Sequence, residues 1–212
     1  MVIVLDGGDD VQRYAASFRD LVFPRPALCP RCAAAGQLVG HGSYARTVTE
    51  PRQTHTIRIK RLLCTACRRT VSLLPTFCLP FRHYQTATIQ AVLTLRCEAQ
   101  ASWATVGRRF LPADLPSRTS CREWVGAFTR TSRGYLAALL RQLATWAARS
   151  SGVELTLADV GTQVTTPAQL IAAVPHLLAG LRQAGLSVAD GGRRWLATLW
   201  QWGKGMQLGR LV

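Results

Sequence analysis

Two cysteine pairs carry the clearest chemistry in this sequence. Cys29 and Cys32 lie in "CPRC", and Cys64 and Cys67 lie in "CTAC". A C-x-x-C turn places two sulfur atoms on one side of a tight turn, and two such turns supply the four corners of a tetrahedron. The 31 residues between the pairs are enough for a zinc ribbon. We therefore expect one structural Zn²⁺ ion held by Cys29, Cys32, Cys64 and Cys67.

Disulfides and a redox dithiol are the alternatives to a metal site. The first residues, "MVIVLDGGDD", lack a basic segment and turn acidic at once, so we do not expect a secretory signal. In the reducing cytosol, C-x-x-C pairs are more often metal-binding or redox-active than disulfide-bonded. A thioredoxin-like site needs one such pair at the end of a strand in a βαβ unit, whereas here there are two in ribbon-like surroundings.

The remaining cysteines and histidines carry weaker signals. Cys78, Cys97 and Cys121 have no partner at metal spacing, and we expect them to be buried as small apolar side chains. His41, in "GHGSY", is a candidate turn residue or phosphate contact.

The charge of the chain points to a polyanionic partner. The net charge is +15, from 26 basic and 11 acidic residues. Residues 29–82 carry a net +8 and residues 83–150 a net +6. Of the basic residues 24 are arginine, whose planar fork matches phosphate and guanine edges. A GC-rich genome would explain arginine in place of lysine, but it would not explain the excess of bases over acids.

The segment between the cysteine pairs is expected to form a β-hairpin. Residues 37–48 and 55–64 have strand-like composition, and 49–54 is the turn between them. Alternation along 57–62 makes one face mixed and the other basic, which suits a hairpin lying against a polyanion. The candidate DNA-binding residues in and beside the ribbon are Arg46, Arg58, Lys60, Arg68 and Arg69.

Beyond the ribbon we expect helices. Residues 71–84 have two prolines and no periodicity, which indicates an extended connector, and 85–99 has helical spacing. A short helix over 102–110, capped by Ser102, then precedes a helix over 117–135 whose buried stripe is Cys121, Trp124, Val125 and Phe128. This order is typical of a helix-turn-helix. Its candidate DNA contacts are Ser117, Arg118, Thr119 and Arg122 at base edges, Arg108 and Arg109 near phosphates, and Arg130.

The last third of the chain is also expected to be helical. We predict helices over 135–149, over 166–186 with Thr166 as cap, and over 193–205. The last contains Trp195, Trp200 and Trp202, which could form part of a core, a dimer face or a docking surface.

The order of the motifs resembles a bacterial family of transposase-like zinc-ribbon and helix-turn-helix proteins found around mobile elements. The resemblance covers residues 20–130, through "FPRPALCPRC", "GHGSYART", "IRIKRLLCTACRRTVSLLPTFCLPFRHY" and "TSCREW". It implies that the four paired cysteines bind zinc and that the "SRTSCREW" helix contacts DNA.

These expectations define a fold and a function. The fold class is mostly α with a small β zinc ribbon. Its parts are an N-terminal strand and helix (1–28), the ribbon and connector (29–82), a helix-turn-helix bundle (83–150) and a helical C-terminal region (151–212). The expected protein is cytoplasmic and nucleoid-associated, has no membrane span, and binds double-stranded DNA for a mobile element in transposition, target-site selection or regulation. Its oligomeric state is left open.

Two other functions remain alternatives. An adaptor would recruit a transposase, an ATPase or an RNA-guided effector through residues 153–212.

An enzyme is not expected, because the acidic residues after the ribbon do not lie on buried strands where two-metal chemistry could be built. The only acidic cluster, Asp6, Asp9 and Asp10, is better explained as acids at a helix N-terminus. A transcriptional repressor is a further form of the DNA-binding function.

Overall fold

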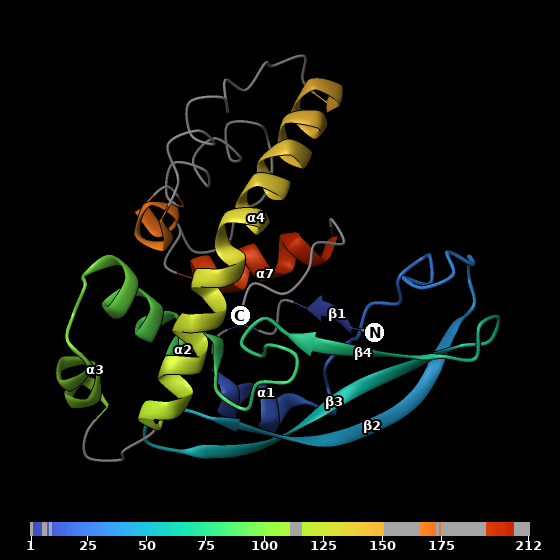
Figure 1. The fold of residues 1–212 in the computed structure, drawn as a ribbon. Helices are drawn as coiled ribbons and strands as arrows, with labels where there is room; N and C mark the ends of the chain where they lie inside the picture. The colour runs from blue at the N-terminus through green and yellow to red at the C-terminus, as the bar shows by residue number, and fades with distance from the viewer. Residues whose placement is uncertain are drawn as a thin grey trace. The chain divides into compact units, whose positions relative to one another are not determined.

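The computed structural model describes residues 2–5, 8, 10–110, 116–150, 166–172, 174 and 194–205. The chain divides into two compact units, residues 1–86 and residues 87–212, and each is described by itself (Figure 1). Helices and a four-stranded sheet are both prominent, so the expected mostly-α class is not clearly shown. The division into four parts stays a prediction. In the described part of the chain, no helix combines the length and apolar character needed to cross a membrane.

The first unit is built on a sheet of four strands. The strands are β1 (Val2–Leu5), β2 (Leu38–Thr49), β3 (Thr54–Cys64) and β4 (Thr70–Pro75), and their order in the sheet is β1-β4-β3-β2 (Figure 1). The antiparallel β2–β3 hairpin confirms the two strands expected between the cysteine pairs, to within a residue at each end. β3 and β4 pair antiparallel, whereas β1 and β4 pair parallel.

The expected connector over 71–84 was wrong in its first part. Residues 70–75 form β4, which lies between β3 and β1 in the sheet. Val71, Leu73 and Leu74 are buried. The alternation of Thr70, Val71, Ser72 and Leu73 covers only four residues before Leu74 and Pro75 interrupt it, so the sequence signal for a strand was weak.

Two small cores lie on opposite faces of this sheet. The cysteine core consists of Cys29, Leu38, Leu62, Cys64, Val71 and Leu73. The α1 core consists of Val11, Tyr14, Val48, Ile57, Ile59, Leu74, Phe77 and Cys78. On β3 the odd-numbered residues Ile57 and Ile59 face the α1 core, and the even-numbered residues Leu62 and Cys64 face the cysteine core. This is the alternation that an extended strand requires.

A β-bulge lets β2 contribute to both cores. Gly40 pairs with Leu62 and Ser43 pairs with Lys60, so two residues of β2 oppose one residue of β3. The extra residue reverses the parity of β2, because side chains alternate with a period of two. Leu38 therefore faces the cysteine core, and Tyr44 and Val48 face the α1 core, although all three positions are even. Gly42 sits in the bulge with a φ of +69°.

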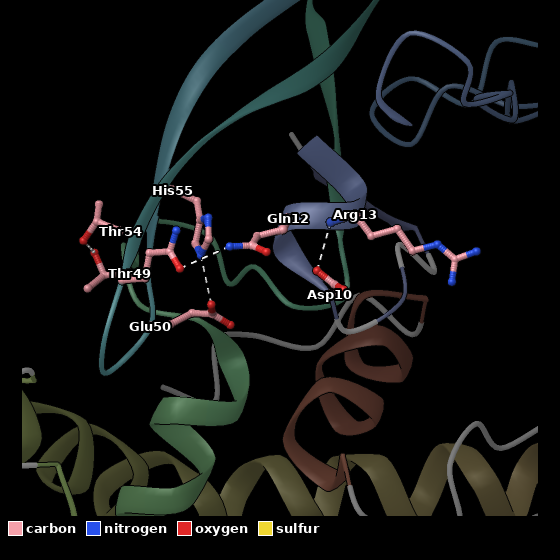
Figure 2. Close-up of polar contacts among 8 residues, drawn as sticks. Asp10, Gln12, Arg13, Thr49, Glu50, Thr54 and His55 are labelled. Carbon is pink, nitrogen blue, oxygen red and sulfur yellow. Dashed lines mark hydrogen bonds and ion pairs between the residues drawn. The ribbon is translucent and has the colours of Figure 1, made fainter. Parts of the chain in front are cut away.

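Helix α1 (Val11–Ser17) is held in place at its start and along its polar side. The Asp10 side chain accepts a hydrogen bond of 2.9 Å from the Arg13 backbone N–H, which caps the helix. Gln12 bonds Gln53 in the β2–β3 turn at 3.2 Å, and Glu50 at the same turn bonds His55 at 3.0 Å (Figure 2). Because Asp10 caps the helix, the capping role expected from the sequence accounts for it without catalysis. Asp6 and Asp9 lie outside the described residues.

The second unit is helical in its described residues. It contains α2 (Thr86–Leu93), a π-helical turn η1 (Thr94–Glu98), α3 (Trp103–Arg109), α4 (Arg118–Ser150) and α7 (Trp195–Gly205). Two separate helices over 117–135 and 135–149 were expected, and this was wrong: α4 is one helix of 33 residues. A glycine such as Gly134 lowers helix stability by about 1 kcal/mol without ending the helix.

Several expected local features of this unit are confirmed. The Ser102 side chain caps α3 by accepting from the Thr105 N–H, and Thr166 and Gln169 bond each other as a capping box. Cys121, Trp124 and Phe128 are buried and Val125 is half-buried. Trp195 and Trp200 are also buried, and the Trp195 ring lies 5.8 Å from that of Phe128, so these two tryptophans belong to the core. The side chain of Trp202 lies outside the part of the chain whose side chains the structure describes.

The bulge yields a stability prediction. Replacing Gly42 with alanine should destabilise unit 1 by about 1 kcal/mol or more, because an L-residue pays that cost in the left-handed region. The matched control is Gly40→Ala, since an added Cβ meets no atom within 4 Å at either glycine and Gly40 lacks the positive φ. The control should change stability by less than about 0.5 kcal/mol.

Hydrogen exchange of the β2 and β3 amides is the suitable measurement for this comparison. All six tryptophans lie after residue 86, so tryptophan fluorescence would report the other unit. Equal protection of the β2–β3 amides in Gly42→Ala and Gly40→Ala would show that the bulge does not need its glycine.

Candidate metal centre

The structure brings the four paired cysteines together. Their Sγ atoms all lie within 4.8 Å of one another, so the four residues could hold a metal ion. The Sγ atoms of Cys29 and Cys67 are 3.9 Å apart, and those of Cys32 and Cys64 are 3.7 Å apart. These distances exclude disulfides, whose S–S bond is about 2.05 Å. A tetrahedral ion at the usual zinc–sulfur distance of about 2.3 Å would separate its sulfurs by about 3.8 Å, which matches the cluster.

The two C-x-x-C turns have the same backbone design. Cys29 O accepts from the Ala33 N–H at 2.9 Å, and Cys64 O accepts from the Arg68 N–H at 2.9 Å. The N–H of Cys29 donates to Ala34 O and the N–H of Cys64 donates to Arg69 O, each at 3.0 Å. Each turn therefore closes one residue beyond its second cysteine, and the two turns present their sulfur pairs to a common centre.

Closing these turns requires a left-handed residue after each pair. Ala33 has a φ of +57° and Arg68 a φ of +55°. Glycine adopts this conformation freely, whereas other residues pay a cost of roughly 1–3 kcal/mol. The turns therefore hold strain that the rest of the site must offset, and a metal ion bound by all four sulfurs supplies such an interaction.

The ionisation of the cysteines also favours a bound cation. The backbone N–H groups of Cys32 and Arg31 donate toward the Cys29 sulfur and lower the pKa of Cys29 to about 6. At Cys32 the Ala34 N–H favours the thiolate, but desolvation and the three neighbouring cysteines outweigh it and raise the pKa of Cys32 to about 11. Without a cation Cys32 is therefore a thiol at neutral pH, and a bound metal ion would favour its thiolate.

The other three cysteines are set up differently. Burial raises the pKa of Cys78 to about 12 and that of Cys121 to about 11, and it also raises the pKa of Cys97. They are therefore thiols at neutral pH. Cys78 and Cys121 are buried, as expected for small apolar side chains, whereas Cys97 is only half-buried.

The candidate DNA-binding residues of unit 1 differ in their surroundings. Arg58, Arg68 and Arg69 are exposed, and Lys60 is half-buried. Arg46 is half-buried, and its guanidinium donates to the backbone carbonyls of Leu79 and Arg82. Arg46 therefore braces the 79–82 turn. The hairpin register indicates this buried position of Arg46, because Arg46 pairs with Ile57 and so lies on the same buried face.

The candidates of unit 2 surround α3 and the start of α4. The exposed ones are Arg108, Arg109, Ser117, Arg118, Thr119, Arg122 and Arg130. Ser117 caps α4, because its hydroxyl accepts from the Ser120 N–H at 3.2 Å. The Arg122 guanidinium lies 5.7 Å from the centre of the Trp103 ring, and that of Arg96 lies 5.1 Å from it. These cation–π contacts, which the sequence did not indicate, connect α3 with η1 and α4.

Removing one sulfur should remove the metal. We expect one divalent ion per chain in the native protein, measured by elemental analysis, and a loss of at least tenfold in metal affinity for Cys64→Ser, because a hydroxyl is a poor replacement for a thiolate. Cys97→Ser makes the same chemical change outside the cluster and should retain the ion. A folded native protein without metal, or metal content unchanged in Cys64→Ser, would contradict the assignment.

Comparison with known proteins adds a family without a known activity. Residues 29–108 match the family described as "Domain of unknown function (DUF6431)". The matched segment begins at the first cysteine of the cluster and ends within α3, so it contains all four sulfur ligands. Comparisons with curated proteins and with solved structures found no match to the chain. The similarity to DUF6431 carries no function with it, and the resemblance to transposase-like proteins stays a prediction.

Proposed function

We propose that this chain is a DNA-binding protein whose first unit is held together by a structural zinc ion. Four sulfur ligands and no open coordination position are typical of structural zinc. Elemental analysis that returns iron in place of zinc would overturn the choice of metal without affecting the cluster itself.

The observation that carries the proposal is a set of exposed arginines that have no acidic partner within the described residues. The ion pair between His55 and Glu50 involves no arginine. The exposed arginines concerned are Arg58, Arg68, Arg69, Arg108, Arg109, Arg118, Arg122 and Arg130. Charges arranged in this way repel one another in the free protein, and a polyanion relieves that repulsion.

Arginine in this arrangement favours nucleic acid over other polyanions. Its guanidinium binds phosphate oxygens in a bidentate manner and reads guanine in the major groove. Between residues 29 and 82 the only acidic residue is Glu50, and it is bonded to His55. A phosphate backbone approaching this segment therefore meets little repulsion.

The second unit supports a helix-turn-helix as the finer form of this proposal. Arg118 and Thr119 are exposed in the first turn of α4, where a recognition helix contacts base edges. Arg108 and Arg109 end α3 and are exposed, as phosphate contacts would be. A role in a mobile element, or as a repressor, remains part of the proposal and rests on the resemblance alone.

The adaptor alternative receives less support from the described residues. Trp195 and Trp200 were the candidate docking side chains of the C-terminal region, and both are buried. A partner could reach them only by opening the core of the unit.

Duplex binding should depend steeply on salt. With about four phosphate contacts, raising the salt from 50 to 200 mM should weaken binding about 100-fold, because each contact releases counterions. Fluorescence anisotropy with a labelled duplex measures this. Replacing both Arg68 and Arg69 with alanine should lower the slope of log K against log salt by about two, because each arginine neutralises one phosphate.

The matched control is the double replacement of Arg13 and Arg19 with alanine. Both residues are exposed and the variant loses the same charge, but they lie in residues 1–28, whose net charge is −1. An equal change in slope for both double variants would show that net charge alone drives binding. A native protein that ignores duplex DNA at low salt would refute the proposed function.

A further inference from the structure

The β2–β3 hairpin continues beyond the rest of its sheet as a two-stranded ribbon. β4 pairs with β3 only from Lys60 to Leu63, whereas the β2–β3 pairing continues to Thr49 and Thr54. The ribbon thus consists of residues 44–49 and 54–59, and the pair Ser43–Lys60 lies where it joins the rest of the sheet. At the usual rise of about 3.3 Å per residue it is roughly 20 Å long.

The two faces of the ribbon differ in chemistry. The covered face contains the cross-strand pairs Tyr44–Ile59, Arg46–Ile57 and Val48–His55, and it packs toward the α1 core. The open face contains the pairs Ser43–Lys60, Ala45–Arg58 and Thr47–Thr56, and it ends at the pair Thr49–Thr54, in which Thr49 is buried. Ala45, Thr47, Thr56 and Arg58 are exposed, and Ser43 and Lys60 are half-buried.

The composition of the open face suits the close approach of a nucleic acid. The four small residues leave the backbone accessible, and the two long side chains are both cationic. None of the six is acidic or large and apolar. On a sheet face that is merely exposed to solvent, acidic and basic residues would be expected to pair across the strands. These pairs lack that pattern.

Arg58 is fixed before any partner binds. Its Nε and one Nη donate to the Ser43 hydroxyl at 3.0 and 2.8 Å. Its backbone carbonyl accepts from the Tyr14 hydroxyl at 3.2 Å. A guanidinium carries five N–H donors, so donors remain for a second acceptor. An ordered side chain loses less conformational entropy on binding, which raises affinity and geometric selectivity.

The covered face makes the ribbon rigid. Arg46 donates to the carbonyls of Leu79 and Arg82, and Thr49 exchanges backbone hydrogen bonds with His83 and Gln85 at the outer edge of β2. A two-stranded ribbon alone is marginally stable in water, so these contacts support it as a binding element.

We propose that the open face of the β2–β3 ribbon enters the major groove of duplex DNA, with Arg58 reading a guanine. Two strands about 4.8 Å apart fit a groove about 12 Å wide, which admits a β-ribbon. The methyl groups of Thr47, Thr56 and Ala45 match the thymine methyl, and the Lys60 ammonium contacts a phosphate or a guanine edge. This inference rests on the proposed DNA-binding function and deepens it, since it names the surface and the groove.

A matched pair of charge insertions tests the surface. Ala45→Glu places a carboxylate on the open face opposite Arg58, and Ala16→Glu places one on the exposed side of α1. Both variants are titrated as full-length protein against duplex DNA, after metal content and circular dichroism have shown that they fold. We expect at least about a tenfold loss of affinity for Ala45→Glu and less than about a twofold loss for Ala16→Glu, because one base contact in the groove is worth roughly 1–3 kcal/mol.

Selection from a pool of random duplexes tests the groove. The native protein should select a preferred sequence, and Arg58→Ala should lose the preference at one G·C position while keeping it elsewhere. Arg13→Ala, which removes an arginine from the exposed side of α1, should select the same sequence as the native protein.

The outcomes separate this inference from the function on which it rests. A native protein that binds no duplex refutes the proposed function and the inference with it. If the native protein binds but Ala45→Glu and Ala16→Glu behave alike, the ribbon is not the interface, although the DNA-binding function stands. If Ala45→Glu weakens all sequences equally and Arg58→Ala leaves the preference unchanged, the ribbon contacts phosphates, and the groove assignment is wrong.

Discussion

Four sulfur atoms from two distant turns share one site, and the first unit depends on that constraint. The first turn precedes β2 and the second follows β3, so a bound ion joins the open ends of the hairpin. Cys29 and Cys64 are also part of the cysteine core, which has only six buried members. A core of that size stabilises its own face of the sheet weakly, and small folds of this kind gain much of their stability from a metal. A bound ion would therefore stabilise the hairpin as well as the turns.

The hairpin register determines which arginines can reach a partner. Because side chains alternate along a strand, a shift of one residue would exchange the two faces of the ribbon. The bulge at Gly42 makes one such exchange within β2, between the cysteine core and the α1 core. The same parity turns Arg46 inward, where it braces the 79–82 turn, and leaves Arg58 on the open face. Two arginines that look equivalent in the sequence thus have opposite roles.

The features that followed from sequence were those with a local physical cause. Ligand spacing, the strands of the hairpin and the caps at Ser102 and Thr166 each depend on a few neighbouring residues. The features that did not follow depend on tertiary contacts. β4 has only four alternating residues before Leu74 and Pro75, and its place in the sheet depends on its pairing with β1 and β3. Helix α4 passes through Gly134 although a break was expected there. The inward position of Arg46 follows from the cross-strand register, because Arg46 lies opposite the buried Ile57. Its hydrogen bonds to the 79–82 turn depend on tertiary packing that the register does not give.

Arg68 shows how the metal site and the proposed DNA surface are connected. Its φ of +55° closes the second cysteine turn, a position where glycine would avoid the strain. An arginine there costs roughly 1–3 kcal/mol of backbone strain, yet its exposed side chain adds nothing to the core. Strain of this kind persists where the surroundings enforce it, and the sulfur cluster meets that condition in both turns, since Ala33 has the same conformation without a long side chain. The strain alone therefore does not explain the arginine, whereas under the proposed function a phosphate beside its exposed guanidinium would explain it. Under the proposed function, a bound ion would both hold the fold and present a cation to the nucleic acid, and the stability of the unit would then be coupled to its affinity for DNA.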